Sequence, residues 1–136
     1  MLDFSKQVFS RLTLHLRGSF PKIYTSRNEN TSPPKFPAAT IVQKNNVNYK
    51  WSIDSSSLEN HVKVMFQIDI YTNDKDELER MELAESIRDE TSDFMLGLGF
   101  NRTMCEPIPN VQDLSIYRIS MRFEGVIGRD AIVYSE

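Results

Sequence analysis

The chain has 136 residues, of which 40% are hydrophobic, and a formal net charge of −3. This composition excludes general disorder, and the length predicts one domain over residues 1–136 with a single core. One cysteine excludes an intrachain disulfide. Because neither an export leader nor an apolar membrane span is evident, we expect a soluble protein made inside the cell.

The charge is distributed unevenly along the chain. Residues 1–60 carry eight Lys/Arg and four Asp/Glu, whereas residues 61–136 carry eight and fifteen. Between Asp74 and Asp93, nine carboxylates accompany three basic residues. We interpret this acidic run as a solvated helix face that disfavours a phosphate backbone, so sequence-specific nucleic-acid binding is not expected. Halves of opposite charge are also compatible with copies that meet head to tail.

The first part of the chain predicts one helix and two strands. Apolar residues at helical spacing predict a helix that begins at an N-cap, Asp3, runs to about Arg17 and is ended by Gly18. Strands are expected over residues 22–26 and 38–46, separated by a polar, proline-rich loop.

The clearest strand covers residues 60–71. One parity is apolar and predicts a buried face, made of Val62, Val64, Phe66, Ile68 and Ile70. The other parity is polar and predicts a largely wet face, with Lys63, Gln67 and Asp69.

The period then changes to that of a helix over residues 76–96. Its apolar stripe consists of Leu78, Met81, Ala84, Ile87, Thr91, Phe94 and Leu98. Asp74 or Asp76 is expected as the N-cap. Gly97 or Gly99 is expected to end the helix in the left-handed conformation, which turns Phe100 back onto the core.

Two further strands are expected near the C-terminus, a short one over residues 101–106 and a long one over residues 114–127, joined by a turn at Pro107 and Pro109. The element order predicts an α+β fold: a mainly antiparallel sheet with two α-helices packed on one face, and long strands with protruding loops or a hairpin.

The length of the two long strands bears on assembly. At about 3.3 Å per residue each would extend roughly 40 Å, whereas a globule of this size is roughly 37 Å wide. Overhanging strands expose backbone groups for pairing with another chain, which is a hint of ordered self-assembly. Strongly bent strands within one domain explain the same length equally well.

Catalytic chemistry is not expected. Two histidines and one cysteine exclude a closed zinc site of His and Cys ligands, and no catalytic or phosphate-binding motif occurs. His61 follows Glu59, but a nucleophile and a pocket are missing. Cys105 lies near Arg102 in sequence and is more simply a small buried residue. We therefore expect no catalytic, metal-binding or cofactor-binding residues and no cofactor.

Four stretches occur together, in order and at suitable separations: PPKFPAATIVQ (33–43), SSSLENHVKVMFQIDIYTN (55–73), LGFNRTMCEPIPNVQD (98–113) and IYRISMRFEGVI (116–127). Together they resemble a family of tailed-bacteriophage tail terminator, or tail completion, proteins, also described as head-tail joining or minor capsid proteins. The resemblance spans most of the chain. It implies a virion structural protein, not an enzyme, that forms a hexameric ring on the head-proximal end of the tail tube, ends tube polymerisation and docks the head connector.

The resemblance also implies partners and a location. The partners are further copies of the chain, the tail tube protein and the head connector or neck protein, with no membrane. The location is the head-proximal end of the tail in the virion, after assembly in the cytoplasm of the host bacterium. The family's recurrent stretches fall here on a candidate assembly interface of twelve residues: Pro34, Phe36, Pro37, Glu59, Asn60, His61, Arg102, Pro107, Pro109, Asn110, Tyr117 and Arg118.

Three alternatives stay open. A neck or head-completion protein acts one layer away from the tube, and its loss gives finished tails without heads instead of overlong tails. A headless, phage-tail-like particle uses the same kind of cap. An enzyme that uses His61, Glu59 or Cys105 belongs to a different class, and a deep pocket with shifted titrations around those residues would reveal it.

Overall fold

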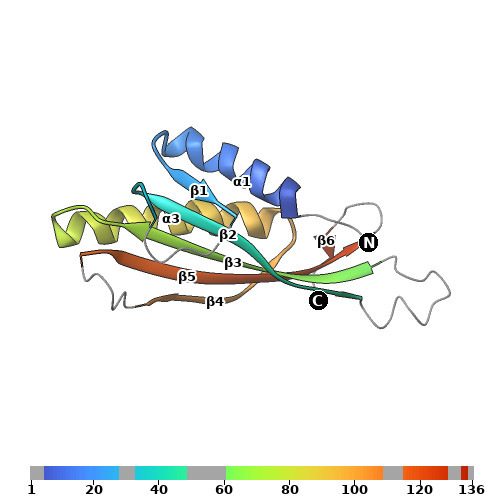
Figure 1. The fold of residues 1–136 in the computed structure, drawn as a ribbon. Coiled ribbons are helices and arrows are strands. Elements are labelled where there is room, and N and C mark those ends of the chain that lie inside the picture. Colours follow the sequence, from blue (N-terminus) through green and yellow to red (C-terminus); the bar gives the residue numbers. More distant parts are fainter. Residues whose placement is uncertain (1–4, 28–32, 49–60, 109–114, 129–132, 135–136) are drawn as a thin grey trace.

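The computed structural model describes residues 5–27, 33–48, 61–108, 115–128 and 133–134. Two helices and six strands lie within these ranges (Figure 1). In chain order they are α1 (Ser5–Ser19), β1 (Tyr24–Ser26), β2 (Ala38–Asn48), β3 (His61–Thr72), α3 (Glu77–Gly97), β4 (Asn101–Pro107), β5 (Tyr117–Gly128) and β6 (Val133–Tyr134).

The strands form one sheet in the order β1-β2-β3-β5-β4, with β6 beside β5. All pairs are antiparallel except β1 with β2. Both helices cover the same face of this sheet, and within the described residues the other face carries no helix (Figure 1). The prediction of an α+β fold with two helices on one face of a mainly antiparallel sheet is therefore confirmed.

Helix α1 buries the stripe that its sequence predicts. Val8, Leu12 and Leu16 are almost completely buried, because a spacing of four residues places them on one side of the helix. The prediction that Gly18 ends the helix is wrong, since the helix continues to Ser19. The Phe20 amide still donates to the Leu16 carbonyl over 2.7 Å. Asp3 lies outside the described residues.

Helix α3 has a capping motif at each end. Asp76 is the N-cap, and its carboxylate accepts the Leu78 amide over 2.9 Å. At the other end Gly99 has a φ of 103°, and its amide donates to Leu96 while the Phe100 amide donates to Met95. This pair of bonds is a Schellman motif, for which glycine is the favoured residue. Of the two glycines considered, Gly99 therefore ends α3.

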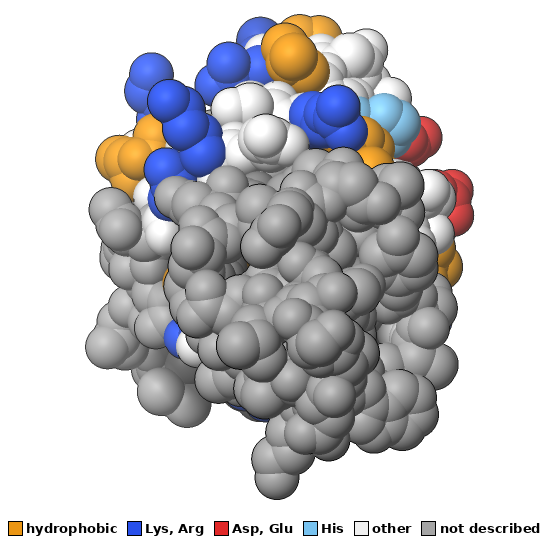
Figure 2. Space-filling view, turned by 90° about the vertical axis from the view of Figure 1, so that its right-hand side faces the viewer, with side chains coloured by type: hydrophobic (Ala, Val, Ile, Leu, Met, Phe, Trp, Pro, Cys, Tyr) orange, Lys and Arg blue, Asp and Glu red, His pale blue; other side chains and the backbone are white. Residues whose placement is uncertain are grey.

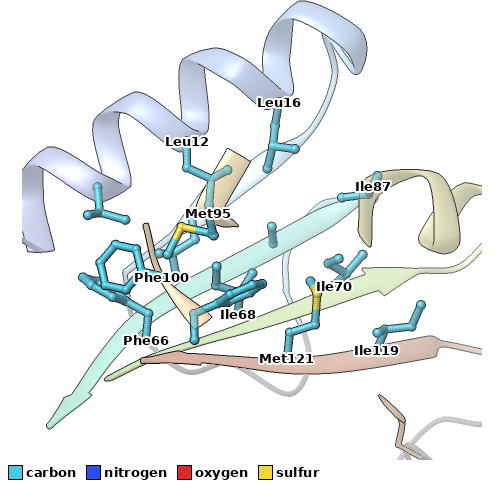
Figure 3. Packing of buried hydrophobic residues seen from close by; sticks show 14 of the residues in the cluster. Leu12, Leu16, Phe66, Ile68, Ile70, Ile87, Met95, Phe100, Ile119 and Met121 are labelled. Carbon is cyan, nitrogen blue, oxygen red and sulfur yellow. The ribbon is translucent and has the colours of Figure 1, made fainter. Parts of the chain in front are cut away.

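The main core lies between the helices and the sheet (Figure 3). Phe100 returns to it as expected, and its ring packs edge-on against Phe66 with centroids 5.6 Å apart. The buried parity of β3 is confirmed for Val64, Phe66, Ile68 and Ile70. In the apolar stripe of α3, by contrast, Leu78 is 62% exposed, because it stands in the first turn of the helix.

The central strands extend beyond their helical cover. Strand β2 reaches Asn48, two residues past the predicted end, and pairs there with Val62 of β3. Figure 1 shows this end of β2, β3 and β5 continuing past both helices. Strand β1 is shorter than predicted, and β5 begins at Tyr117. We call this uncovered end of the sheet the His61 end, and the opposite end, where β3 finishes and β5 starts, the Thr72 end.

Candidate assembly surfaces

Six of the twelve predicted interface residues come together at the Thr72 end of the sheet. They are Pro34, Phe36, Pro37, Pro107, Tyr117 and Arg118. Phe36 is partly buried against a small cluster of Ala38, Tyr71 and Ile116 on the helix-free face. The Pro37 carbonyl accepts the Tyr24 amide over 2.9 Å, which fixes the entry into β2 against β1. Residues distant in sequence therefore share one end of the molecule.

Arg118 lies at the centre of a polar network on the helix-free face. Its Nη2 is 3.3 Å from Asp69 Oδ2, and its guanidinium lies 5.6 Å from the centroid of the Tyr71 ring. Burial raises the pKa of the Tyr71 hydroxyl, the charge of Asp69 raises it further, and Arg118 lowers it. Arg118 thus compensates a carboxylate that is almost completely buried.

The network continues along β3 and back to β5. Gln67 donates from Nε2 to Asp69 Oδ2 over 3.2 Å, and Arg122 donates from Nε to Gln67 Oε1 over 3.3 Å. Gln67 is 8% exposed and Asp69 is 2% exposed. The prediction of a largely wet face is therefore wrong for these two residues, because basic side chains from the neighbouring strand lie over them.

A row of polar side chains crosses the same face. The register pairs Thr40 with Asp69, and Asp69 with Ser120, so their side chains share one side of the sheet. Within the part of the chain that the structure describes, Thr40 Oγ1, Asp69 Oδ1 and Ser120 Oγ make no hydrogen bond although they are buried. The network is thus only partly satisfied, a costly state for buried polar atoms.

Tyr117 of β5 and Pro107 of the edge strand β4 both belong to the covered face of the sheet, because Pro107 stands opposite Ile119. Tyr117 packs against the main core, and its hydroxyl pKa is raised by burial and by Glu85, while Arg88 lowers it. The Ile108 amide donates to the Arg118 carbonyl over 2.9 Å. Since strand residues alternate in direction, the backbone of Pro107 faces away from β5, toward the free edge of the sheet.

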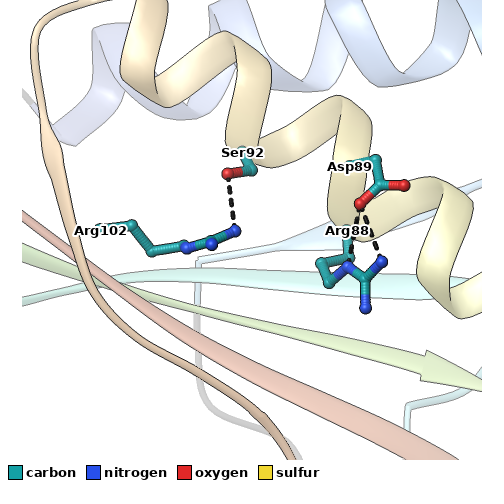
Figure 4. Close-up of polar contacts among 4 residues, drawn as sticks. All are labelled: Arg88, Asp89, Ser92 and Arg102. Carbon is teal, nitrogen blue, oxygen red and sulfur yellow. Dashed lines mark hydrogen bonds and ion pairs between the residues drawn. The ribbon is translucent and has the colours of Figure 1, made fainter.

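Arg102 lies apart from these six residues. It stands near the other end of β4, and its Nη1 donates to the Ser92 hydroxyl of α3 over 3.1 Å (Figure 4). On the same side of α3, Arg88 contacts Asp89 over 2.9 Å (Figure 4). Arg102 therefore ties the edge strand to the helix above it. Cys105 is half-buried and packs against the main core.

Of the five remaining predicted residues, the structure describes only His61. Glu59, Asn60, Pro109 and Asn110 lie outside the described residues. The backbone of His61 opens β3 and pairs with Gly128. His61 therefore stands at the opposite end of the sheet from Arg118 and Pro107. The eight predicted residues that the structure describes do not form one continuous site.

The sequence interpretation missed Asp69, Gln67, Tyr71 and Arg122 as members of a polar network. A signal for them was present. The polar parity of residues 63–71 carries Lys63 and Asp69, and the polar parity of residues 118–124 carries Arg118, Arg122 and Glu124, so each strand offers charges of both signs. Two long strands of one sheet with such parities are candidates for direct pairing across the ladder.

The two helices carry opposite charges. Helix α1 has Lys6, Arg11 and Arg17 and no acidic residue, whereas α3 has seven acidic and two basic residues. They meet where His15 Nε2 lies 3.0 Å from Glu90 Oε2. Figure 2 shows Lys and Arg side chains gathered over the upper part of this view, and Asp and Glu side chains beside the histidine. The helix layer is therefore polarised across the molecule.

Other kinds of site have little support among the described residues. Within them, no three His, Cys, Asp or Glu side chains gather into a group able to hold a metal ion. Neither α1 nor α3, the helices of the described ranges, has the length and apolar character needed to cross a membrane. Near the start of β4 a hollow of about 80 Å³ is lined by Lys63, Asn101, Thr103, Glu124 and Gly125, too small for a substrate-sized ligand.

Comparison with known proteins adds no assignment: no family model matches the chain, and no match is found among the curated proteins.

Proposed function

We propose that the chain is a tail terminator subunit. Copies of it form a ring, most simply of six, that caps the head-proximal end of a bacteriophage tail tube, ends tube polymerisation and provides the docking surface for the head connector. The ring acts in the virion without catalysis or a cofactor. The support from sequence is the ordered set of four stretches that resemble this family.

The observation that carries the proposal is the length of the central strands relative to their helical cover. Among the residues whose side chains the structure describes, those of the main core reach Ile41 in β2 and Val64 in β3, and the β2–β3 ladder continues to Asn48 and Val62, past both helices (Figure 1). Seven residues of β2 beyond Ile41 correspond to about 23 Å of strand. A sheet end without helical cover is a surface that a bound partner, here the tail tube or the connector, can cover.

The edges of the sheet also suit a ring. In the described residues, one lateral edge consists of the three-residue strand β1 and of β2 beyond Thr40, and the other consists of β4 and, nearer the His61 end, of β6. Rings are built by heterologous contacts, in which two different surfaces of each subunit meet. Unlike edges supply such a pair of surfaces. The Thr72 end and the His61 end are then free to face the tail tube and the connector.

The direct test uses purified protein and the tail tube protein of the same phage. We expect light scattering or native mass spectrometry to find a ring several times the 15.8 kDa mass of the chain. Added to growing tubes, the ring is expected to stop their elongation and to remain at one end. A chain that forms no ring and leaves tube growth unchanged would refute the terminator role.

Electron microscopy of particles made without this chain distinguishes a tail terminator from a neck or head-completion protein and from the cap of a headless particle. Overlong tails are expected for a terminator. Finished tails of normal length that lack heads would instead indicate a neck or head-completion protein. Overlong tubes in a particle that never carries a head would identify the same capping activity in a headless particle.

A further inference from the structure

Strand β2 has a long free side in the described residues. Of its eleven residues, the first three pair with β1, which leaves the eight residues Ile41–Asn48 without a neighbouring strand on that side. Strand β4, with seven residues, is the last strand of the β1-β2-β3-β5-β4 order and also has a free side. A free strand side presents backbone N–H and C=O groups with which another strand can pair.

The backbone of β2 faces its free side only at certain residues, which we call outward residues. The Tyr24 amide donates to the Pro37 carbonyl, and in a parallel pair this directs the backbone of Ala39 toward β1. The direction then alternates along the strand, and the pairing with β3 shifts by one residue between Gln43 and Asn45. The outward residues beyond β1 are therefore Ile41, Gln43, Asn46 and Asn48.

Strand β4 has the same kind of pattern on its free side. The Ile108 amide donates to the Arg118 carbonyl of β5, so the residues next to Ile108 and its alternates face away from β5. The pairing with β5 shifts by one residue between Arg102 and Met104. The outward residues of β4 are therefore Arg102, Cys105 and Pro107.

We propose that β4 of one copy pairs antiparallel with the free side of β2 in the next copy, so that the sheet continues from subunit to subunit around the ring; this inference rests on the proposed function. Outward residues are ordinarily two apart, but Gln43 and Asn46 are three apart on β2. Arg102 and Cys105 are likewise three apart on β4. Only one antiparallel alignment of β4 with β2 superposes these two intervals. It sets Gln43 opposite Cys105 and Asn46 opposite Arg102.

This alignment also fits the lengths of both strands. It sets Pro107 opposite Ile41 and Asn101 opposite Val47, so all seven residues of β4 fall within the eight free residues of β2. The pairing of β1 with β2 ends at Thr40, immediately before this stretch. The incoming strand therefore begins to pair where β1 stops, without displacing it.

The faces and directions of the two strands agree with a ring. Gln43 stands opposite Phe66 and Cys105 stands opposite Met121, so both belong to the covered face, and their pairing keeps neighbouring helix layers on one side. Strands β2 and β4 run in opposite directions within one sheet. Copies related by rotation about an axis along the strands therefore meet antiparallel, and repetition of this contact closes a ring.

Disulfide formation tests the register. In Gln43→Cys the new thiol lies opposite the native thiol of Cys105 in the next copy, and the Cα separation of such a pair, about 5.5 Å, suits a disulfide. With oxidised glutathione we expect cross-linked chains up to the number of subunits in the ring on denaturing gels. The control Gln43→Cys/Cys105→Ser is expected to give none. Val42→Cys is also expected to give none, because neighbouring strand residues point to opposite faces.

A proline tests the backbone contact independently. Gln43→Pro removes an outward amide hydrogen, and a proline is tolerated in a strand where its nitrogen faces away from the pairing partner. We expect each contact of the ring to weaken by about tenfold, because one backbone hydrogen bond is lost. The matched control Gln43→Ala keeps the amide and is expected to keep the ring. Circular dichroism and urea unfolding establish that each variant is folded.

Two results would overturn the inference while the terminator role survives. One is a Gln43→Cys ring that caps tubes but gives no cross-links. The other is a ring whose cross-links persist when Cys105 is replaced by Ser. Assembly into pairs of chains only would indicate two-fold pairing of β2 with β2, which has the same interval, and would overturn both the inference and the ring. Absence of any assembly and of capping in the wild-type chain would remove the proposed function itself.

Discussion

The two faces of the sheet are buried in different ways. On the covered face, Phe66, Ile68 and Ile70 are completely buried by apolar side chains of the helices and of the neighbouring strands. On the helix-free face, Asp69 and Tyr71 are buried almost as fully, but Asp69 lies among polar side chains, and Tyr71 lies between Arg118 and a small apolar cluster. Strand periodicity separates the two faces correctly. It does not reveal that the polar face is shielded from water.

The difference lies in what holds each face together. Apolar burial is non-directional, so the covered face tolerates small changes in geometry. The helix-free face depends on directional contacts in which Arg118 and Arg122 reach across from β5 to β3. Loss of one member leaves a buried polar atom without its partner, and such losses are costly. The two faces should therefore respond differently to substitution, and four experiments test this.

The largest effect is expected on the covered face. Phe66→Ala removes a completely buried ring that packs against Phe100, and we expect a loss of about 3–5 kcal/mol in the free energy of unfolding, measured in urea. The control Leu78→Ala, at a position 62% exposed, is expected to change it by less than about 0.5 kcal/mol. Equal effects at the two positions would mean that the core is placed wrongly.

The next effect is on the helix-free face. Arg118→Ala leaves Asp69 without its compensating charge, and we expect a loss of about 2–3 kcal/mol in the free energy of unfolding. This is below the value for a fully buried pair because the Arg118 side chain is 20% exposed. The comparison is the more exposed pair of Lys63 and Glu124, where Lys63→Ala should cost no more than about 1 kcal/mol. A loss at Arg118 as small as that at Lys63 would contradict a shielded polar face.

A smaller effect compares two threonines, one on the helix-free face and one in the helix that packs on the covered face. Thr40 of β2 and Thr91 of α3 both have a buried hydroxyl without a hydrogen bond in the described structure. Val removes the hydroxyl and keeps the shape, so each substitution is expected to be neutral or to stabilise the fold by up to about 1 kcal/mol. If Thr40→Val destabilises the protein while Thr91→Val does not, the helix-free face is hydrated or contacted by another group.

The smallest effect concerns pH. Because the pKa of the Tyr71 hydroxyl is raised above 10.0 in the folded chain, the folded state keeps this proton when the unfolded state loses it. This difference in pKa contributes to the free energy of unfolding. The contribution is fully present below about pH 10 and is lost as the pH rises through the pKa that Tyr71 has in the folded chain. The unfolding midpoint in urea should therefore fall less steeply between about pH 9 and pH 11 in Tyr71→Phe than in the wild type. Identical slopes would show that Tyr71 is more accessible than its surroundings indicate.

Much of the fold follows from local signals in the sequence. The alternation of Val64 to Ile70, the Asp76 cap and the turn at Gly99 each depend on a few neighbouring residues, and each was predictable. Gly18 carried the same signal as Gly99, but α1 continues through it. Gly99 adopts the positive φ that favours glycine at a helix end, whereas Gly18 stays within the helix, which ends one residue later.

The polar network was not predictable in the same way. Gln67 and Arg122 are separated by 55 residues, so the contact between them depends on the pairing of two distant strands. Alternation assigns Asp69 and Gln67 to the polar face, but only the register with β5 shows which cations lie over them. The gathering of Phe36, Pro107 and Arg118 at one end likewise follows from the strand order, which no local pattern specifies.

The backbone of Pro107 faces the free edge of β4 and therefore limits the pairing of a further strand with β4. A strand that approached β4 from outside would find the amide of Cys105 available, but at the next outward position the proline ring offers no hydrogen to donate. Stacking of many chains into a continuous fibre through this edge is thereby discouraged. A protein that must join a fixed number of neighbours and then stop is well served by an edge that accepts only a short strand.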